Sequence, residues 1–373
     1  MNTSVVLVAA GKGERLGLGV PKAEALIGGK TLFEHALSAV KQFNPAQLVV
    51  VAHPDLLEHY REVAQSFEFK SLDVVAGGET RQDSVSNGLN QVTHAKVLVH
   101  DVARAFMPAA VFGEVESALE TFDCVIPVLT ISDTLKSVSG TTVVGTVDRS
   151  SVVKSQTPQG FHVESLEKTL ATTKQNFTDE SALMEAAGFS VGTVAGSELG
   201  LKLTTPADLD WARLRFGGSR TGIGTDAHKF GATGTLTLGC ITWPDVPALE
   251  GHSDGDSVAH AIVDALLGAA GLGDIGSNFG VDRPEYAGAS GAVFISGALE
   301  LVAAAGFVPV NVAVQVIADK PKIGPRRAEL ETRLSNLVGA PVSVLATTTD
   351  GLGFLADAKG VAAVATALLR ERS

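Results

Sequence analysis

Glycines and cations follow the first apolar run of the chain. Gly11 and Gly13 come directly after residues 5–9, and Arg15 and Lys22 follow them. Glycines let backbone N–H groups approach a polyphosphate closely, and the two side chains supply the positive charge that phosphoryl chemistry needs. The glycine spacing fits neither the dinucleotide fingerprint nor the P-loop. A plain strand–helix connection therefore stays open as the alternative for this loop taken alone.

Polar side chains also follow two later apolar runs. Segment 77–85 offers Ser84 where a base could be recognised, and Asp101 and Arg104 stand at the end of residues 97–100. In parallel α/β sheets, ligands bind beyond the carboxyl ends of the strands. The structural alternatives are that Ser84 caps a helix and that Asp101 and Arg104 form a surface ion pair. Three such segments at successive strand ends favour a binding site.

Metal-ligating side chains gather in the second half of the chain. Asp226 and His228 are two residues apart at the end of a predicted strand, so both side chains point to one face. His260 lies at the start of a predicted helix, behind an acidic, glycine-containing loop at 251–256. One carboxylate, two neutral imidazoles and one open position suit a tetrahedral Zn²⁺ site that accepts a substrate oxygen. A lone histidine is more often structural, and the loop could merely cap the helix.

The elements that must position these residues alternate regularly in the first half. Apolar runs predict strands, with amphipathic stretches between them, at 5–9, 48–51, 72–75, 97–100 and 124–129. This alternation predicts an α/β fold with a largely parallel sheet and helices on both faces. A closing helix at 208–216, followed by glycines at 217 and 218, predicts a boundary between domains 1–218 and 219–373.

The second half is predicted to be α+β, with a mixed α/β fold as the alternative. Strands are expected at 221–225, 236–238, 310–317 and 342–348. Helices are expected at 293–305 and from the end of the acidic loop to residue 268. The Ala- and Leu-rich stretch Val361–Arg372 is predicted to form a final helix.

Composition narrows the class of protein. The 373 residues are 45% hydrophobic with a formal net charge of −12, which excludes a wholly disordered chain and argues against a nucleic-acid partner. The longest apolar run, Val361 to Leu369, is far shorter than a membrane span, so no membrane association is expected. Two distant cysteines, Cys124 and Cys240, fit a reducing compartment. We therefore expect a cytoplasmic protein.

Ordered motifs in residues 3–215 resemble the 2-C-methyl-D-erythritol 4-phosphate cytidylyltransferase family. They are A-A-G-x-G-x-R at 9–15, P-K at 21–22, G-G-x-x-R-x-x-S-V at 77–85, H-D-x-x-R at 100–104, D-T-L-K at 133–136, V-D-R at 147–149, T-P-Q at 157–159 and T-D-E-S-A at 178–182. The resemblance implies a Rossmann-like nucleotide-diphosphosugar transferase fold, with CTP and methylerythritol phosphate as substrates and Mg²⁺ or Mn²⁺ as cofactor. It also implies a homodimer in which Arg149 reaches the neighbouring subunit's site.

The same resemblance implies roles for individual residues. Arg15 and Lys22 would hold the triphosphate and the reacting phosphorus, next to Ala10 and Gly11. The cytidine would bind at Gly78, Glu79 and Ser84. The methylerythritol phosphate would be held by Asp101, Arg104, Thr134, Arg149, Thr157 and Lys202. Of these, Arg149, Thr157 and Lys202 join Arg15 and Lys22 as candidate catalytic residues, although a solvated strand-end lysine is the alternative for Lys202.

Motifs in residues 220–370 resemble the 2-C-methyl-D-erythritol 2,4-cyclodiphosphate synthase family. They are D-x-H at 226–228, G-H-S-D-G-D-x-x-x-H-A-I-x-D-A-L-L-G-A-A at 251–270, L-G-D-I-G at 272–276, P-K at 321–322 and A-T-T-T-D-x-L-G-F at 346–354. The resemblance implies a homotrimer with active sites between subunits and Zn²⁺ bound by Asp226, His228 and His260. It also implies a second divalent ion, Mg²⁺ or Mn²⁺, near Asp350, which stands where the family usually has Glu.

This second resemblance assigns further residues. His252 and Thr348 would be catalytic, with Ser253 and Asp254 beside the substrate phosphates. The methylerythritol hydroxyls would be held by Asp274, Ile275 and Gly276. The nucleotide pocket, contributed by a neighbouring subunit, would contain Ala318, Lys322, Ala346, Thr347 and Phe354.

Three departures from the synthase pattern lie close to these residues. F-G-V-D-R-P at 279–284 replaces F-P-D-T-D-P, and Leu345 replaces a lysine. The segment A-D-A-K-G at 356–360 exchanges the charge signs of the usual G-R-x-E-G. We expect Asp357 and Lys359 to keep an intersubunit ion pair near the trimer axis with inverted polarity.

Together the two resemblances imply a bifunctional enzyme of the non-mevalonate isoprenoid route. Its two reactions are not consecutive, because the first product must gain a 2-phosphate, so a separate CDP-methylerythritol kinase is an implied partner. A dimeric half and a trimeric half on one chain could close into a hexamer. Two alternatives stay open, namely a general sugar-phosphate nucleotidyltransferase fused to a zinc phosphodiesterase, and a non-catalytic scaffold.

Overall fold

The chain folds into two compact units, Met1–Ala212 and Arg213–Ser373. The computed structural model describes residues 2–11, 13, 19–173, 175–251, 253–280, 286, 288–353 and 359–372. The division falls inside helix α7 (Pro206–Phe216), which ends one residue before the predicted stop signal, Gly217. None of the helices in these ranges combines the length and the apolarity that a bilayer crossing requires.

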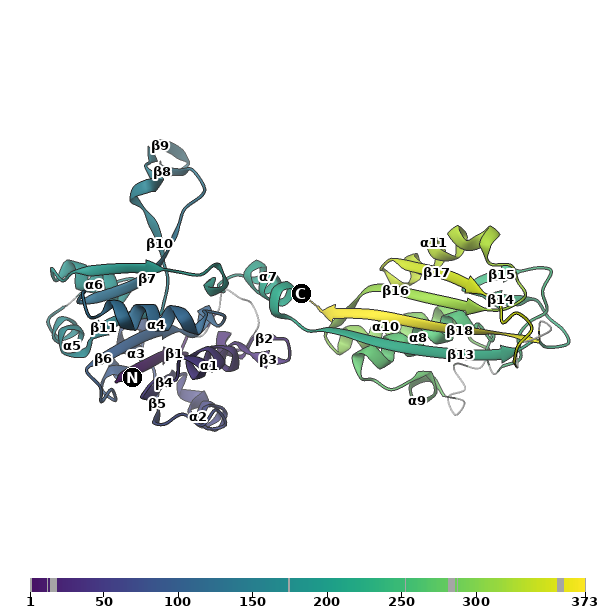
Figure 1. Ribbon diagram of the computed structural model, residues 1–373, viewed down its shortest axis with the longest axis horizontal. Coiled ribbons are helices and arrows are strands. Elements are labelled where there is room, and N and C mark those ends of the chain that lie inside the picture. The colour runs from purple at the N-terminus through teal and green to yellow at the C-terminus, as the bar shows by residue number, and fades with distance from the viewer. Residues whose placement is uncertain are drawn as a thin grey trace. The chain divides into compact units, whose positions relative to one another are not determined.

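An eight-stranded sheet forms the centre of the first unit (Figure 1). Its main path runs β10-β7-β11-β6-β1-β4-β5, and β12 also pairs with β7. Its strands are β1 (Thr3–Val8), β4 (Gln47–Ala52), β5 (Leu72–Ala76), β6 (Lys96–Asp101), β7 (Cys124–Thr130), β10 (Val153–Ser155), β11 (Gln159–His162) and β12 (Val191–Ala195). β1 pairs in parallel with both β4 and β6, and β4 pairs in parallel with β5. The predicted parallel arrangement is therefore confirmed for the four strands that precede the first-half motifs.

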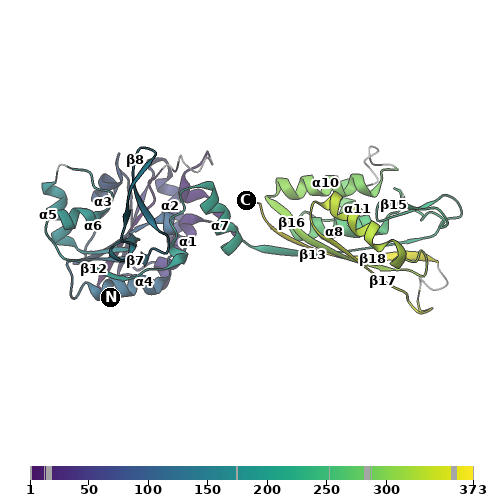
Figure 2. The same cartoon turned by 90° about the horizontal axis from the view of Figure 1, so that it is seen from above.

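Helices cover both faces of this sheet, as predicted (Figure 2). They are α1 (Leu32–Phe43), α2 (Leu57–Gln65), α3 (Arg81–Leu89), α4 (Ala109–Ala118), α5 (Val163–Thr172) and α6 (Glu180–Ala186). α3, α5 and α6 share one core cluster with Val6, Val49 and Val51. On the opposite face α1 and α4 pack together, with the rings of Phe43 and Phe112 5.6 Å apart. Side chains alternate along each buried strand, so one strand supplies both cores.

Two short hairpins extend from the first unit. The smaller pairs β2 (Leu26–Ile27) with β3 (Lys30–Thr31), and the larger pairs β8 (Leu135–Ser139) with β9 (Thr142–Val147). The β8–β9 arm projects away from the sheet next to β10 (Figure 1). Its valines Val138, Val143 and Val144 are 63%, 57% and 63% exposed. Three apolar side chains of one hairpin are therefore exposed.

The second unit is built on a four-stranded sheet with the order β13-β18-β16-β17. These strands are β13 (Ser219–Lys229), β18 (Gly360–Glu371), β16 (Phe307–Ile317) and β17 (Val342–Thr347), beside a separate hairpin of β14 (Leu236–Leu238) and β15 (Ile241–Trp243). Its helices are α8 (Ser257–Ala270), α9 (Ile275–Phe279), α10 (Gly291–Ala304) and α11 (Arg327–Val338). The predicted α+β mixture is confirmed.

Helix α8 lies unusually close to β13. A Cβ on Gly222 would lie 2.2 Å from the carbonyl oxygen of Ala265, and one on Gly224 would lie 2.1 Å from that of Ala261. Because these contacts are to helix backbone, no side-chain rearrangement could relieve them. The two glycines thus set the distance between the strand and the helix that carries His260.

One predicted element is wrong, because residues 361–372 do not form a helix. Residues 361–371 belong instead to β18, the strand that pairs along its length with both β13 and β16. Its buried side chains facing the α8 core include Val361, Ala363, Ala365 and Ala367. Alanine favours helices in isolation, but pairing at both edges overrides that preference. The outer face is also largely apolar, so the two-residue period was hidden in the sequence.

We predict that Gly224→Ala destabilises the second unit by about 1–3 kcal/mol, because the added methyl group must push α8 away from β13. The matched control is Gly268→Ala, where the nearest atom to an added Cβ is 3.9 Å away. Calorimetric unfolding of the whole chain measures both variants. Equal unfolding temperatures for the two variants would contradict the packing argument.

Candidate active sites

A cavity of ≈ 910 Å³ lies beyond the carboxyl ends of β1, β4, β5 and β6 in the first unit. It brings together predicted residues from separate motifs, namely Ala10, Gly11, Lys22, Gly78, Glu79, Ser84, Asp101 and Lys202. Arg15 lies outside the described residues. The strand-end rule therefore located this cavity correctly, because parallel pairing places all four strand ends at one edge of the sheet.

Close backbone approaches hold the cavity's loops together. Gly13 has a φ of 68°, and a Cβ there would lie 2.4 Å from the Cβ of Lys22, in the short turn Lys22–Glu24. A Cβ on Gly77 would lie 2.3 Å from that of Ala10. The glycines thus let the loop after β1 contact both the lysine turn and the loop after β5.

Ser84 is not the helix cap that the structural alternative supposed. Thr80 caps α3 and forms a capping box with Asp83. Ser84 lies one turn further on, accepts a hydrogen bond from the Gly78 N–H at 3.1 Å and donates one to the Thr80 carbonyl at 2.9 Å. Its hydroxyl therefore shapes the loop at 77–80, where the nucleotide was expected.

The structural alternative for Asp101, a surface ion pair with Arg104, is also not found. Asp101 instead pairs with Arg81, whose Nη2 lies 3.0 Å from Oδ1, and with Lys202, whose Nζ lies 2.7 Å from Oδ2. Burial alone would raise the pKa of the Asp101 carboxyl, but the Arg81 and Lys202 charges hold it well below its usual range. Arg81 stood inside the 77–85 motif without an assigned role. The sequence did contain a signal for its role, because a cation in the first turn of a helix that follows a strand end faces the expected binding site.

Arg104 is used inside the protein instead of facing the cavity. Its Nη1 donates to the Gly200 carbonyl at 2.9 Å and its Nη2 to the Ser155 carbonyl at 3.1 Å. Arg104 is absent from the cavity lining. It therefore braces the chain around Lys202, two residues beyond Gly200.

Thr157 is buried next to the backbone of Asp101. Its hydroxyl accepts a hydrogen bond from the Asp101 N–H at 3.1 Å and lies 3.0 Å from Nδ1 of His100. Burial, with the charge of Arg104, lowers the pKa of His100 to about 4, so this imidazole is neutral near pH 7. Thr157 and His100 thus support the end of β6 from within the core.

Thr134 and Arg149 lie apart from this cavity. Thr134 is exposed just before the β8–β9 arm, and Arg149 follows the arm and donates to the Ser132 carbonyl. Neither lines the cavity of the same chain.

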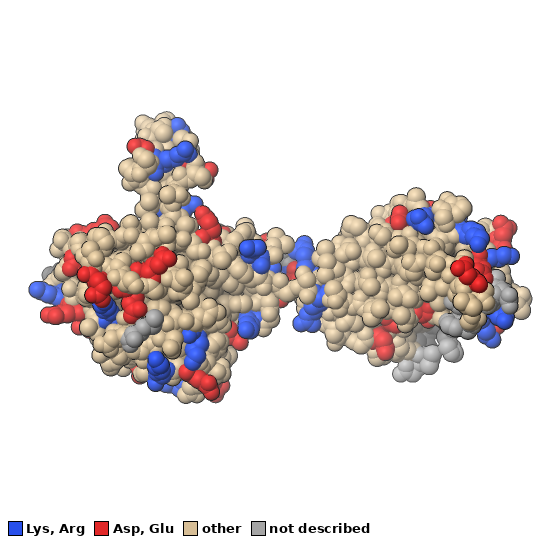
Figure 3. All heavy atoms as spheres, viewed as in Figure 1, with Lys and Arg blue, Asp and Glu red and all other residues tan. Residues whose placement is uncertain are grey.

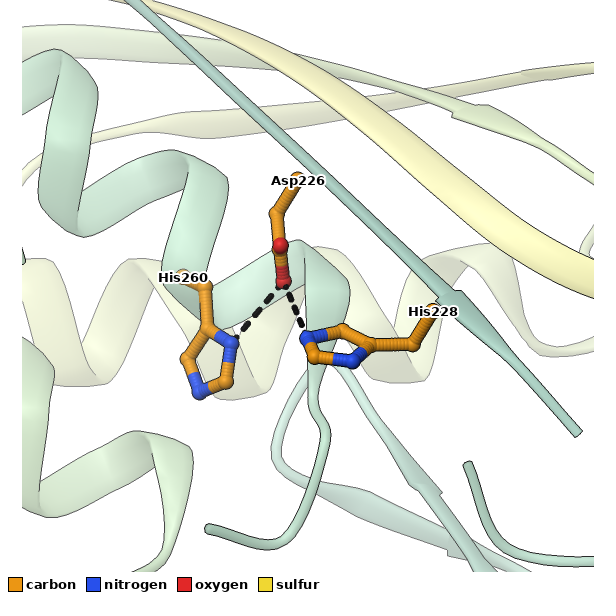
Figure 4. Close-up of side chains that lie close together, drawn as sticks. All are labelled: Asp226, His228 and His260. Carbon is orange, nitrogen blue, oxygen red and sulfur yellow. Dashed lines mark hydrogen bonds and ion pairs between the residues drawn. The ribbon is translucent and has the colours of Figure 1, made fainter. Parts of the chain in front are cut away.

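The second site joins two elements of the second unit (Figure 4). Asp226 and His228 come from the last residues of β13, and His260 from the first turn of α8. Oδ2 of Asp226 lies 2.9 Å from Nε2 of His228 and 2.9 Å from Nδ1 of His260. Burial would raise the pKa of Asp226, but the two imidazoles hold it well below its usual range. The ligand atoms lie within 4.8 Å of one another, as a shared metal ion requires.

Neighbouring groups orient both imidazoles. Nδ1 of His228 lies 2.7 Å from the Glu250 carbonyl, so it carries the proton and leaves Nε2 for a metal. Ser253 Oγ lies 3.1 Å from Nε2 of His260. One carboxylate and two oriented imidazoles fit a divalent metal with an open coordination position. His252 lies outside the described residues.

The acidic loop before α8 combines the functional and the capping interpretations. Asp256 is fully buried, caps α8 and accepts from the N–H groups of Gly239 and Cys240. Asp254 accepts from the Gly291 N–H at 2.9 Å and ties the loop to α10. Both carboxylates are therefore used in building the loop that presents Ser253.

Segment 274–276 forms the start of α9, next to the helix that carries His260. Asp274 caps α9 through a capping box with Ser277, while the Ile275 N–H donates to Asp264 of α8 at 2.7 Å. Gly276 occupies the first turn. The hydrogen bond to α8 fixes this segment relative to the metal ligands.

The expected nucleotide residues gather at the ends of β16 and β17. Ala318 donates its N–H to the Thr347 carbonyl at 3.0 Å, which joins the 318–322 turn, with Lys322, to Ala346 and the residues after it. β13 and β16 run parallel on either side of β18, so this turn lies at the same sheet edge as Asp226. Thr348 donates to Asp350 at 2.9 Å. Among the described residues, Asp350 does not join the metal cluster.

Some predicted residues of the second half cannot be placed. Phe354, Asp357 and the departures at 281–283 lie outside the described residues. Lys359 is described, and its carbonyl accepts from the Phe230 N–H at 3.0 Å. The expected Asp357–Lys359 pair therefore stays a prediction.

Comparison with known families matches almost the whole chain. Residues 3–216 match the family described as 2-C-methyl-D-erythritol 4-phosphate cytidylyltransferase, and residues 219–370 match the YgbB family. The first match covers the unit with the cation-lined cavity, and the second covers the unit with the Asp–His–His cluster.

Curated relatives carry both halves on one chain. A bifunctional IspD/IspF enzyme of Clavibacter michiganensis is 47% identical over 98% of this chain and 93% of its own length. One of Rhodospirillum rubrum is 38% identical over 98% of both chains. The solved bifunctional IspDF of Campylobacter jejuni has a TM-score of 0.50 and 28% identity, covering 100% of this chain and 99% of that one.

We predict that His100 makes the first unit lose stability as the pH falls from 6.5 to about 4. In this pH window the imidazole is protonated in the unfolded chain but neutral in the folded one. The free energy of unfolding therefore falls by roughly 2 kcal/mol between pH 7 and pH 5. His100→Gln should flatten this part of the pH profile, because it removes the buried imidazole. Urea unfolding at both pH values is the measurement, and parallel pH profiles for wild type and His100→Gln would refute the prediction.

Proposed function

Because the chain belongs to the family of bifunctional IspD/IspF enzymes of isoprenoid biosynthesis, we propose that its two sites perform the two reactions of that family. The first unit transfers CMP from CTP to 2-C-methyl-D-erythritol 4-phosphate and releases pyrophosphate. The second unit converts 4-CDP-2-C-methyl-D-erythritol 2-phosphate into the 2,4-cyclodiphosphate and releases CMP. The observation that carries this proposal is that each family match spans a unit whose predicted reactive groups converge.

In the first reaction an oxygen of the 4-phosphate attacks the α-phosphorus of CTP, and pyrophosphate leaves with the bridging oxygen. Two anions must meet, so the site has to neutralise charge and align the reactants. Lys22 and Lys202 line the cavity where this occurs, and Arg15 is assigned to the same task by family similarity. Asp101 is paired with two cations and does not accept a proton. A phosphate nucleophile needs no general base, so the reaction does not depend on proton transfer to Asp101. Mg²⁺ or Mn²⁺, when bound with CTP, would neutralise part of the triphosphate charge.

We assign the remaining first-site residues by the same similarity. Ala10 and Gly11 bind the triphosphate of the nucleotide, and Gly78, Glu79 and Ser84 bind the cytidine. The position of these five residues in the cavity lining supports both assignments. Asp101 and Lys202 hold the methylerythritol phosphate. Arg104 and Thr157 support that subsite from behind, given the hydrogen bonds that occupy them. Thr134 and Arg149 act at the neighbouring subunit's site.

In the second reaction the 2-phosphate attacks the β-phosphorus of the CDP group, the ring closes, and CMP leaves. Asp226, His228 and His260 would hold Zn²⁺, which supplies a Lewis acid at the β-phosphate when bound. The Glu250 carbonyl keeps His228 in the tautomer that can ligate. Ser253 and His252 orient the substrate phosphates, and Asp274, Ile275 and Gly276 its hydroxyls. A second divalent ion near Asp350 would balance the charge of the departing CMP.

The nucleotide in the second reaction binds at the ends of β16 and β17 of a neighbouring subunit. The pocket would comprise Ala318, Lys322, Ala346, Thr347, Thr348 and Phe354. The hydrogen bond between Ala318 and Thr347 supports this grouping. The 2-phosphate itself must come from a separate CDP-methylerythritol kinase. We also keep the division into domains 1–218 and 219–373, which the family matches at 3–216 and 219–370 support.

We propose that the assembly pairs first units through their β8–β9 arms and groups second units in threes. The arm's exposed valines support the first contact, and in Figure 3 most atoms on the visible face of the arm carry no charge. In the second unit, Ile223 and Leu345 are 66% and 49% exposed and face away from the α8 core. Dimeric and trimeric contacts on one chain would close into a hexamer.

The two reactions should be separable by single substitutions, which ³¹P NMR of the whole chain can test. Lys22→Met is expected to abolish pyrophosphate release from CTP and methylerythritol phosphate while the cyclisation continues. His228→Asn is expected to abolish the cyclisation and to lower the zinc content well below one ion per chain, while CMP transfer continues. Each variant thus serves as the folding control for the other.

Different products would overturn parts of the proposal. An open-chain bisphosphate in the second reaction would make the second unit a zinc phosphodiesterase. A silent first reaction in the wild-type chain would assign another sugar phosphate to the first unit. Turnover of neither substrate would favour a scaffold.

We predict that Val143→Glu breaks the arm contact, because it places a carboxylate in an apolar interface. Sedimentation velocity should then report a trimer in place of a hexamer. Thr141→Glu, at the exposed tip of the same hairpin, is the control and should leave the mass unchanged. An unchanged mass for Val143→Glu would mean that the arm does not mediate the dimer.

A further inference from the structure

Four charged side chains of alternating sign run from helix α6 to the first cavity. Nη1 of Arg81 contacts both carboxylate oxygens of Glu180, at 2.7 and 2.8 Å. Nε and Nη2 of Arg81 contact Oδ1 of Asp101, at 3.1 and 3.0 Å. Oδ2 of Asp101 then contacts Nζ of Lys202 at 2.7 Å. The guanidinium is therefore shared between two carboxylates, and only one oxygen of Asp101 remains for the lysine.

Glu180 begins this series of contacts but does not line the cavity. Its side chain is only 3% exposed, against 28% for Arg81 and 42% for Lys202. A carboxylate so deeply buried is costly unless it is paired, and among the described residues Arg81 is the side chain that pairs with it. Glu180 therefore acts on the cavity through Arg81.

The position of Glu180 is itself fixed by its own helix. Asp179 caps α6 by accepting from the Ala182 N–H at 3.0 Å. Gln159 of β11 donates to Asp179 at 2.9 Å and accepts from the Ser181 N–H at 3.2 Å. The first turn of α6 is thereby attached to the central sheet, so Glu180 has little freedom to follow a moving partner.

We propose that Glu180 is a positioning residue of the cytidylyltransferase reaction, which holds Arg81 so that Asp101 keeps Lys202 at the methylerythritol phosphate subsite. The inference rests on the proposed function, since it assigns Lys202 to that substrate. Glu180 itself touches neither the nucleotide nor the sugar phosphate.

The preference of guanidinium groups for forked pairing explains the effect. Without the Glu180 carboxylate, Arg81 would have unpaired N–H donors in a buried place, and the nearest other carboxylate is Asp101. A forked pair of Arg81 with Asp101 occupies both carboxylate oxygens. Lys202 then loses its partner and leaves the place where it would meet the incoming phosphate. Loss of one negative charge behind Arg81 would by itself favour anion binding, so a weakened substrate affinity can come only from lost geometry.

The test compares Glu180→Gln with Glu185→Gln, an exposed glutamate on the same helix. For Glu180→Gln we expect the KM for methylerythritol 4-phosphate to rise on the order of tenfold, the size expected for losing a charged hydrogen bond. The KM for CTP should change less than about twofold, because the other cavity contacts remain. Glu185→Gln should match the wild type in both, and the cyclisation reaction of each variant should be unaltered.

A double-mutant cycle then asks whether the effect passes through Lys202. In a Lys202→Met background, Glu180→Gln should leave kcat/KM for methylerythritol 4-phosphate unchanged, since the residue that it positions is already absent. Additive losses would overturn the proposal. So would a KM equal to that of Glu185→Gln, or equal increases in the two KM values.

Two further outcomes are distinguishable from these. If Glu180→Gln does not fold, as calorimetry would report, Glu180→Asp takes its place; it weakens the same pair and must raise the same KM. If the wild-type chain shows no turnover of methylerythritol 4-phosphate, the proposed function fails. The position of Lys202 relative to a bound phosphate, compared between the wild type and Glu180→Gln, would then still test the positioning. We expect Lys202 to lie near the phosphate in the wild type and not in the variant.

Discussion

The repulsion between phosphate anions is the constraint that shapes both halves of this molecule. Each reaction brings one phosphate group against another, in a chain whose formal net charge is −12. Positive charge must therefore be supplied locally, since the field of the whole protein opposes it. The first unit supplies it with lysines and arginines, and the second with an Asp–His–His cluster suited to a divalent ion.

Cations gathered for this purpose also repel one another, and the structure resolves this by inserting carboxylates between them. Asp101 lies between Arg81 and Lys202, and Glu180 lies behind Arg81. Pairing offsets the free-energy cost of removing each charge from water, and it fixes the direction in which each side chain points. In the second unit Asp226 lies between two imidazoles. In both units a carboxylate thus contacts the reactive groups on either side of it, which are the cations of the first cavity and the metal-ligating imidazoles of the second site.

Backbone packing far from the chemistry decides whether these groups meet. Parallel pairing of β1 with β4 and β6 places the cavity's loops at one sheet edge. Glycines in β13 let α8 approach closely enough for His260 to reach Asp226. A methyl group at Gly224 would move a ligand that lies many residues away in sequence. The stability of the second unit and the geometry of the metal ligands therefore depend on the same contact between β13 and α8.

The sequence by itself determined which groups could do chemistry and in which half they lie. Gly11, Lys22, Ser84 and Asp101 follow predicted strands, and the spacing of Asp226 and His228 places both on one face, because strand periodicity is a local property. What only the tertiary structure decided depends on contacts between distant segments. Residues 361–371 form part of a central strand because β13 and β16 pair with both of its edges. Asp101 binds Arg81 and Lys202 instead of Arg104, because α3 and the segment before α7 bring those cations to it. Charge pairing across a fold is chosen by proximity, and proximity exists only after the chain has packed.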